Sequence, residues 1–290
     1  MEFRDMSIEL DGIIGWIANN WVWPAAILGI IVLFFIVISL LPDAKMATSD
    51  KFPTEGDEAR ALAVGAIQTT TSFGAWNDPE AQNISGSKSL RKKLVEMWDL
   101  TSRDSWLETI RELPERRTDP LRDGLLSLRA ELADSLGHRP SKREWVAAAK
   151  NQGASGLEIT KVIDDIVTIE ASMKKKKLGT VVLPDAATIR HTRGYAYGQC
   201  IALATWGVAL GFATREEIQP LIKQISDRAR EDFGSWEEFG RSYLLGRTLR
   251  LVEQGMEPEK AIENTEDGLV AYGRAFDAKR GGGPWSTLPW

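Results

Sequence analysis

A single uncharged run, Trp21 to Leu41 (WVWPAAILGIIVLFFIVISLL), constrains this 290-residue chain more than any other feature. As a helix rising ~1.5 Å per residue, the run matches the thickness of a bilayer hydrocarbon core, ~30 Å. It lacks the polar stripe of a helix that packs on a globular core. Trp21 and Trp23 suit the headgroup zone, and Pro24 falls in the first turn, where its missing N–H is tolerated. We therefore predict one transmembrane anchor.

The flanking residues predict an uncleaved anchor. Arg4 is the only basic residue among the first twenty, so the basic start of a cleaved signal peptide is absent. Lys45, Lys51 and Arg60 follow the run, and the positive-inside rule then places the large part in the cytoplasm. Apolar residues from Ile8 to Trp21 recur at helical spacing, which predicts either an amphipathic interfacial segment or an extension of the anchor helix.

Charge and the scarcity of metal-binding residues exclude several classes of function. The net charge is −5, and residues 1–43 hold five acidic residues and one basic residue, which leaves −1 for the rest. This balance offers no basic footprint, so we expect no nucleic-acid partner. The single cysteine, Cys200, excludes an intramolecular disulfide. With only His138 and His191 available as well, the sequence predicts no metal centre and no cofactor site.

The apolar pattern predicts an all-α protein in three parts. Residues 1–43 form the amphipathic segment and the anchor. Residues 44–88, rich in Ser, Thr, Gly, Asp and Asn, are predicted to be a flexible tether with one short helix at 57–66, and residues 89–290 a helical domain. The strand signal is confined to 180–183. Helices are expected at residues 90–98, 102–113, 120–136, 142–150, 157–177, 186–211, 215–232, 236–254 and 258–276.

Several helix ends are marked in the sequence. Ser141, Thr214 and Ser235 are each followed three residues later by Glu, the pattern of a capping box. The run Lys174 to Lys177 closes the 157–177 helix, where its charges complement the helix dipole and stay solvated. The alternative is that this run binds phosphate or anionic lipid.

The segment from Arg190 to Gly211 (RHTRGYAYGQCIALATWGVALG) is predicted to be the central helix. Its small residues allow neighbouring helices to approach closely, although each interior Gly costs up to ~1 kcal/mol relative to Ala. We expect the best candidate site in a groove along this helix. The groove residues are Arg190, His191, Arg193, Tyr195, Tyr197 and Trp206. The alternative is an ordinary helix end with its arginines in solvent.

A second candidate surface lies on the helix at 236–254. Its apolar residues predict ordinary packing, and the alternative is a polar contact surface or pocket. That surface would comprise Trp236, Glu237, Glu238, Arg241 and Arg247. The C-terminal tail carries Trp285 and Trp290 between prolines and is too proline-rich to predict a helix. We expect it to dock on its own domain, the alternative being a partner protein.

Four segments resemble a known bacterial family, the domain of unknown function numbered 1266. They are LVEMWDLTSRDSWLETIREL (94–113), TWGVALGFATREE (205–217), FGSWEEFGRSYLLGR (233–247) and GGPWSTLPW (282–290), and the resemblance spans residues 90–290. It implies family membership but no activity, because none is assigned to the family. Relatives often carry an Asp and an Arg three residues apart in the central helix, where this chain has Ala196 and Gln199.

No catalytic constellation in the sequence names a reaction. An enzyme would need a nucleophile with a base, a paired-carboxylate cleft or a phosphate loop. Adjacent acids such as Asp164 and Asp165 point to different helix faces. We therefore expect a protein-interaction module, an adaptor or an immunity-type partner, anchored in the bilayer through residues 21–41. The alternatives are an enzyme with its site near Arg190–Tyr197 and a sensor of anionic lipid.

Overall fold

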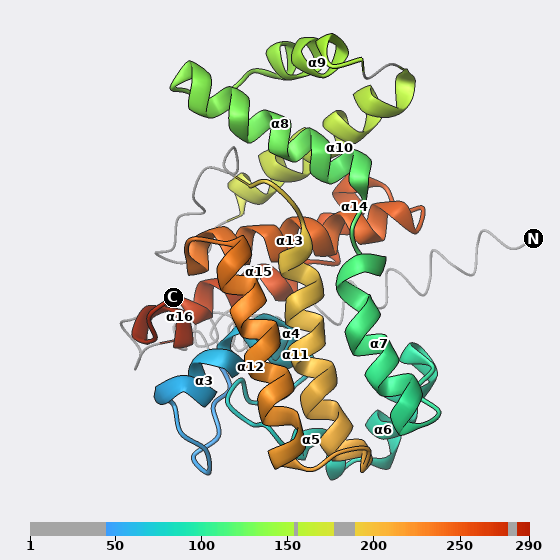
Figure 1. The fold of residues 1–290 in the computed structure, drawn as a ribbon, viewed down its shortest axis with the longest axis vertical. Coiled ribbons are helices and arrows are strands. Elements are labelled where there is room, and N and C mark those ends of the chain that lie inside the picture. Colours follow the sequence, from blue (N-terminus) through green and yellow to red (C-terminus); the bar gives the residue numbers. More distant parts are fainter. Residues whose placement is uncertain (1–44, 154–155, 177–188, 278–282) are drawn as a thin grey trace, which may run out of the picture. The chain divides into compact units, whose positions relative to one another are not determined.

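The computed structural model describes residues 45–153, 156–176, 189–277 and 283–290. Lys45 to Trp290 form one compact unit, and its described residues contain helices and no strands (Figure 1). None of the helices in these ranges is long and apolar enough to cross a membrane. The predicted anchor at 21–41, the segment before it and the strand signal at 180–183 lie outside the described residues and stay predictions.

The helices follow one another in three groups. The first comprises α3 (Gly56–Leu62), η1 (Ala63–Gly65), α4 (Ala66–Thr71) and α5 (Gln82–Ser85). The second comprises α6 (Lys88–Trp98), α7 (Arg103–Arg116), α8 (Pro120–Leu136), α9 (Lys142–Asn151) and α10 (Leu157–Lys175). The third comprises α11 (Arg193–Leu210), α12 (Arg215–Asp232), α13 (Trp236–Glu253), α14 (Pro258–Glu263), α15 (Glu266–Ala275) and α16 (Pro284–Thr287).

Most predicted helices of the domain are confirmed to within three residues, and two differ. The helix expected at 186–211 begins only at Arg193, because Asp123 accepts hydrogen bonds from the backbone N–H and the hydroxyl of Thr192 and holds that residue outside the helix. The helix expected at 258–276 is divided into α14 and α15. At the break, the Thr265 hydroxyl donates to the carbonyl of Ala261 at 2.8 Å, a local bond that competes with helix continuation.

Two of the three predicted capping boxes are complete. Ser141 and Thr214 each accept from the N–H three residues on, and the following Glu carboxylate accepts from the cap residue's own N–H. Ser235 caps α13 in the same way, but Glu238 accepts instead from the N–H of Gly234, at 2.8 Å.

Helix α11 lies at the centre of the unit, between α7, α12 and α13 (Figure 1). Its small residues admit these neighbours. A Cβ added at Gly207 would lie 2.3 Å from the Trp106 ring, and one added at Gly194 would lie 2.8 Å from the Phe239 carbonyl oxygen. The Trp106 indole Nε1 donates to the Leu203 carbonyl at 2.7 Å. The small residues therefore permit the close helix packing that the sequence predicted.

The substitution Gly207→Ala tests this packing. We expect it to lower the free energy of unfolding by about 2–3 kcal/mol, because the Trp106 ring is itself buried and must shift. Gly124→Ala in α8 is the matched control, since a Cβ there meets no atom within 4 Å. The control should stabilise the protein by about 0.5–1 kcal/mol. Urea unfolding followed by circular dichroism measures both, and equal effects of the two substitutions would contradict the packing argument.

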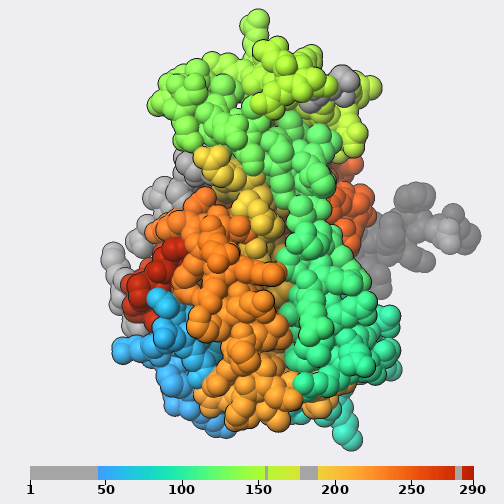
Figure 2. All heavy atoms as spheres, viewed as in Figure 1, coloured from blue at the N-terminus to red at the C-terminus, as the bar shows by residue number. Residues whose placement is uncertain are grey.

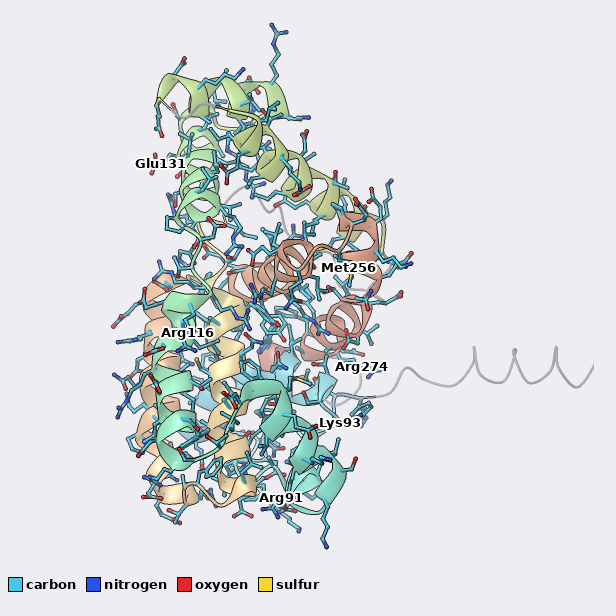
Figure 3. The ribbon with its side chains drawn as sticks, turned by 90° about the vertical axis from the view of Figure 1, so that its right-hand side faces the viewer. Arg91, Lys93, Arg116, Glu131, Met256 and Arg274 are labelled. Carbon is cyan, nitrogen blue, oxygen red and sulfur yellow. The ribbon has the colours of Figure 1, made fainter. Side chains whose placement is uncertain are left out.

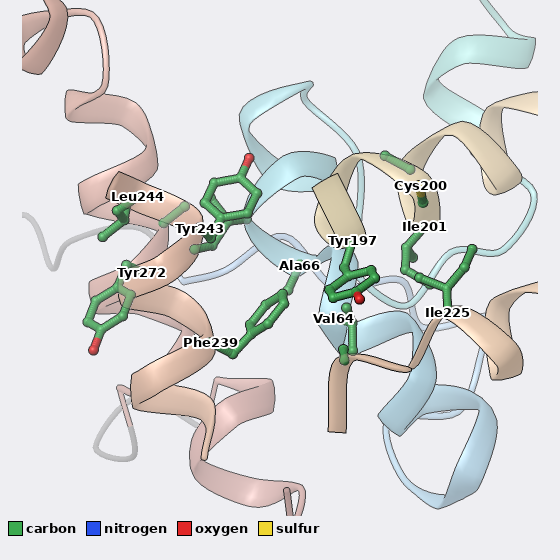
Figure 4. Close-up of a cluster of buried hydrophobic side chains, with 14 of the residues drawn as sticks. Val64, Ala66, Tyr197, Cys200, Ile201, Ile225, Phe239, Tyr243, Leu244 and Tyr272 are labelled. Carbon is green, nitrogen blue, oxygen red and sulfur yellow. The ribbon is translucent and has the colours of Figure 1, made fainter. Parts of the chain in front are cut away.

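The prediction of a flexible tether at 44–88 is wrong from residue 45 onward. Val64 and Ile67 are buried in the core, and Tyr243 donates to Gln68 at 2.8 Å. Figure 4 shows Val64 and Ala66 among side chains of α11, α12, α13 and α15. The polar composition suggested a flexible segment, but its polar side chains form hydrogen bonds that hold the loops in place. Buried Asn77, for example, donates to the carbonyls of Ser49 and Phe52, both at 2.9 Å.

The short helix predicted at 57–66 is confirmed as α3 and η1. Glu58 on α3 pairs with Arg215 on α12 at 2.7 Å, and the same guanidinium lies over the Phe52 ring. Figure 2 shows α3, in blue, against the orange surface of α12. This first group of helices is thus part of the folded unit.

The C-terminal tail docks on its own domain, as predicted, but it includes a short helix, α16, that was not expected. Pro284 sits at the first position of α16, where its missing N–H costs nothing. The Trp285 ring stacks on Trp236 at 5.3 Å between centroids. The Trp290 Nε1 donates to the Phe233 carbonyl at 2.7 Å. Aromatic packing and indole hydrogen bonds together hold the tail.

Helices α8, α9 and α10 form a lobe at one end of the unit, the top of Figure 1. Trp145 of α9 is buried there and donates to the Leu125 carbonyl at 2.8 Å. Buried Arg129 lies over the Trp145 ring at 4.7 Å and donates to both oxygens of Glu170, at 3.0 and 2.8 Å. A buried ion pair therefore joins α8 to α10.

Candidate functional site

The candidate site lies where the chain enters α11. Ser242 on α13 donates to the His191 carbonyl at 2.8 Å and accepts from the Gly194 N–H at 3.0 Å. A Cβ at Gly246 would lie 2.7 Å from the Thr192 carbonyl oxygen, so α13 passes close beside this entry. The entry segment is thereby fixed, which positions its side chains.

Three of these side chains gather around Asp232, the last residue of α12. The Tyr197 hydroxyl donates to Asp232 Oδ2 at 2.7 Å, and Arg193 contacts the same oxygen at 3.0 Å. The His191 Nε2 lies 4.0 Å from Asp232 Oδ1 and the imidazole packs against the Phe233 ring at 4.9 Å. One carboxylate thus bonds Tyr197 and Arg193 to the end of α12, and the His191 imidazole lies beside it.

Burial sets the protonation of this cluster. It lowers the pKa of His191 to about 4, assisted by the positive charge of Arg193 and opposed by Asp232. Burial also raises the pKa of Tyr197, as does its hydrogen bond to Asp232. Burial raises the pKa of Asp123 as well, against the charge of Arg122 and the hydrogen bonds from Thr192. His191 is therefore a neutral imidazole at pH 7.

A cavity of about 270 Å³ opens beside the cluster. It is lined by Glu115, Thr118, Asp123, Gly124, Ser127, Arg190, His191 and Arg193. Two of its buried atoms, His191 Nδ1 and Asp123 Oδ2, have no hydrogen-bond partner. Buried polar atoms are normally satisfied, so two unsatisfied atoms beside one cavity mark it as the candidate site.

The hydroxyl groups of the cavity are already engaged. Ser127 donates to the Arg190 carbonyl at 3.0 Å, and Thr118 donates to the Pro114 carbonyl at 2.9 Å. Neither faces a base as an activated nucleophile would. Cys200 is fully buried, its pKa is raised by burial, and its Sγ lies 3.4 Å from the Ile110 carbonyl oxygen. Across the described ranges, no three His, Cys, Asp or Glu residues come close enough to hold a metal ion.

The other predicted groove residues lie elsewhere. Tyr195 packs against the Tyr243 ring at 5.4 Å and beneath Arg117, and burial raises its pKa. Tyr195 and Tyr197 are two positions apart, so they project from different sides of α11 and cannot share one groove. Trp206 is buried in the core. The structure therefore gathers four of the six predicted groove residues, and it brings Arg190, His191 and Arg193 to the cavity wall.

The second predicted surface on α13 is dispersed. Trp236 is buried and donates to the Leu288 carbonyl at 2.9 Å, whereas Glu237 is exposed. Arg241 is buried. Arg247 donates to both carboxylate oxygens of Asp267, at 2.8 and 2.9 Å. Trp236 thus packs against the C-terminal tail and Arg247 makes the α13–α15 contact, while Glu238 accepts from the N–H of Gly234 at the start of the helix.

Two larger cavities have a different lining. One, of about 590 Å³, includes Lys45, Trp76 and Arg274. The other, of about 440 Å³, includes Arg129 and His138 in the α8–α10 lobe. Neither brings a carboxylate and an imidazole with unused buried atoms to one wall.

The comparison with protein families covers most of the unit. The family described as "Protein of unknown function (DUF1266)" matches residues 93–290. The chain belongs to the DUF1266 family. No curated protein and no solved structure matches the chain. The resemblance stated from the sequence is thus confirmed for the domain, and every residue that lines the candidate cavity falls inside the DUF1266 match.

The folded unit of this DUF1266 chain extends beyond the family match. Residues 45–92 precede the match yet pack into the same core, as the hydrogen bond from Trp285 Nε1 to the Ala63 carbonyl at 2.9 Å illustrates. Ala196 and Gln199, where we expect a departure from the family pattern, are buried in α11. The Gln199 Oε1 has no hydrogen-bond partner there.

Two site residues of the DUF1266 domain, Asp123 and Asp232, escaped the sequence analysis. They lie on α8 and at the end of α12, and no short spacing links them to the Arg190–Tyr197 segment. Asp123 stands in the first turn of a helix marked by Asp119 and Pro120, which indicated only helix capping. Only the packing of α8 and α12 beside α11 makes them site residues.

The neutral imidazole of His191 gives the domain a pH-dependent stability. Because its folded-state pKa is lowered, the stabilisation is complete above the ordinary pKa of 6.5 and is lost as the pH falls toward 4. We expect about 2–3 kcal/mol of acid destabilisation from this group. In urea unfolding at pH 7, 5.5 and 4, the free energy of unfolding should fall less with decreasing pH in His191→Gln than in the unaltered protein. His138→Gln, at an exposed histidine, is the control, and equal slopes in His191→Gln and the unaltered protein would contradict the assignment.

Proposed function

We propose that this DUF1266 chain is a membrane-anchored protein-interaction module that receives a polar side chain of its partner in the cavity beside His191. The partner group would donate to Asp123 Oδ2 and bond to His191 Nδ1, the two buried atoms without partners. Arg190 and Arg193, about half and a third exposed, lie at the same cavity and face the partner's surface.

The size of the cavity is the observation that carries this proposal. At about 270 Å³ it falls just below the usual range of small-molecule sites, about 300–1,000 Å³. A single inserted side chain fits such a space, in the manner of an interface anchor that fills a pocket. The engaged hydroxyls of Ser127 and Thr118 also favour binding over catalysis.

The anchor at 21–41 would hold the domain at a bacterial inner membrane, with the domain in the cytoplasm. The support is the length of the uncharged run and the basic residues that follow it. An adaptor of an envelope assembly and an immunity-type partner of a toxin both fit this arrangement.

Crosslinking and affinity purification of the full chain from its native membrane, with mass spectrometry, tests the proposal. Gly124→Leu adds bulk at the cavity wall from an open position, because a Cβ there meets no atom within 4 Å. Ser135→Leu adds the same bulk at an exposed position of α8 and is the matched control. We expect one stoichiometric partner, retained by Ser135→Leu and reduced at least about tenfold by Gly124→Leu.

A chain beginning at Lys45 serves as the unanchored reference, since the folded unit starts there. Recovery of no protein above that reference, or full recovery with Gly124→Leu, would argue against the proposal.

A second candidate is an enzyme that uses the same cavity. The unpartnered His191 Nδ1 beside Asp123 favours it, because an imidazole and a carboxylate can share the handling of a proton. This candidate predicts a small polar ligand that raises the unfolding temperature of the unaltered protein but not of Gly124→Leu. Full function of Arg193→Ala and Tyr197→Phe in the cell would count against it.

A further inference from the structure

Helix α6 presents a basic surface that the candidate site does not use. Lys88, Arg91, Lys92 and Lys93 are all exposed, and Leu94 is the one buried residue of the helix. The only acid in α6 is Glu96, which lies 3.6 Å from Lys92. Figure 3 labels Arg91 and Lys93 at the lower part of the molecule, away from the α8–α10 lobe. The helix therefore carries an excess of positive charge on its solvent side.

Two large apolar side chains accompany this charge. Met97, on α6 itself, is 73% exposed, and Phe73, in the loop after α4, is 85% exposed. Phe73 also has a φ of 63°, in the left-handed region that favours glycine. Neither burial nor backbone preference accounts for an aromatic residue at this position. An apolar environment outside the domain would account for it.

Helix α5 connects the Phe73 loop to the start of α6. Asn83 of α5 donates to the Ser72 carbonyl at 3.1 Å, directly before Phe73. Gly86 and Ser87 then lead from α5 into α6, and the Ser87 hydroxyl caps α6 by accepting from the Leu90 N–H. Lys51, also exposed, donates to Gln82 of α5 at 2.8 Å and adds to the positive charge here. The loop that carries Phe73 is thus joined through α5 to the start of the basic helix.

We propose that this region is a docking surface for an anionic lipid bilayer. The basic residues Lys88, Arg91, Lys92 and Lys93, hereafter the α6 face, are spread around the exposed half of the helix. Their long side chains would reach the headgroups from both sides of the helix, and Met97 and Phe73 would enter the interface. Each Lys or Arg near an anionic leaflet strengthens surface binding about fivefold. The α6 face is distinct from the lysine run at 174–177, where Lys176 already pairs with Glu266 at 3.2 Å.

Tethering makes this docking effective. Only Pro42, Asp43 and Ala44 separate the predicted span from Lys45, the first residue of the folded unit. A short tether of this kind converts a weak surface contact into an intramolecular one at a high effective concentration. The inference rests on the membrane location in the proposed function, but not on a protein partner. The test for a protein partner uses the cavity beside His191 and the substitution Gly124→Leu, so either test can fail without the other.

A fluorescence experiment on the full chain tests the docking. Met97→Cys labelled with an environment-sensitive dye reports on α6, and Cys200 does not compete for the dye because it is fully buried. The protein is reconstituted in vesicles of phosphatidylcholine alone or with about one-third phosphatidylglycerol. We expect a blue shift of the emission only with phosphatidylglycerol, lost in about 0.5 M salt.

Two controls make the result specific. The triple substitution Lys88→Gln, Arg91→Gln and Lys93→Gln should weaken the binding of α6 to phosphatidylglycerol about a hundredfold and so remove the blue shift. The free energy of unfolding should not change, because these side chains are exposed. A dye at Leu136→Cys, in the α8–α10 lobe, should not respond to lipid. Equal emission in the two vesicle types, a shift that survives the triple substitution, or an equal shift at position 136 would each overturn the proposal. Membrane insertion without any shift would leave the anchor intact and reject the α6 face alone.

Discussion

Trp285→Ala is expected to lower the free energy of unfolding by about 3–5 kcal/mol, the range for truncating a buried aromatic residue. Trp285 is 4% exposed and stacks on Trp236, with Phe239 edge-on at 5.8 Å. Its Nε1 donates to the Ala63 carbonyl, so the substitution also removes a buried hydrogen bond. Ala63 precedes the family match, and the side chain therefore joins the C-terminal tail to the N-terminal group of helices.

Trp285→Phe separates packing from hydrogen bonding. It keeps a ring against Trp236 but removes the donor to Ala63, so a loss of about 1–2 kcal/mol is expected. Trp290→Ala, at a partly exposed residue of the same tail, should cost less than Trp285→Ala. Urea unfolding followed by far-ultraviolet circular dichroism gives all three values. A cost below 1 kcal/mol for Trp285→Ala would mean that the tail does not stabilise the fold.

Glu170→Gln is expected to be comparably severe, at about 3–5 kcal/mol, because it leaves a buried charge without its counter-ion. The side chains of Glu170 and Arg129 are 3% and 1% exposed. Arg139 contacts Glu170 at 2.7 Å but is 38% exposed, so Arg139→Ala should cost only about 0–1 kcal/mol. The contrast between the two substitutions tests whether the loss of unfolding free energy depends on the burial of the ion pair rather than on contact alone.

The double substitution Arg129→Met with Glu170→Met completes this test. Replacing both members of a buried ion pair by apolar residues is often neutral or stabilising, so much of the stability lost in Glu170→Gln should return. Thermal unfolding of the four proteins at one pH provides the comparison. If the double variant is as unstable as Glu170→Gln, the pair stabilises the lobe through geometry that apolar packing cannot replace.

Local signals predicted the individual helices well. Apolar spacing, Ser and Thr caps and terminal glycines act within one or two turns, and α8 and α12 accordingly have the predicted bounds. The four segments that carried the family resemblance lie within the region that matches DUF1266. The docking of the aromatic tail followed from the same sequence, because large apolar side chains at Trp285 and Trp290 require burial.

Local signals failed where polar residues fold through distant contacts. The segment 44–88 resembled a tether in composition, yet Asn77, Glu58 and Gln68 are bonded across the unit or to neighbouring loops. Composition reports how many polar groups a segment has but not whether partners satisfy them.

The sequence by itself determined the helical class, most helix bounds, the family and the part of the site that lies on one short segment, Arg190 to Tyr197. Those features depend on residues a few positions apart, where backbone geometry fixes which side chains meet. Tertiary structure alone decided that Asp123 and Asp232 complete the site, that Tyr195 turns away from it, and that Arg129 finds Glu170. These contacts join helices far apart in the chain, and their partners are selected by close packing around α11 and within the α8–α10 lobe.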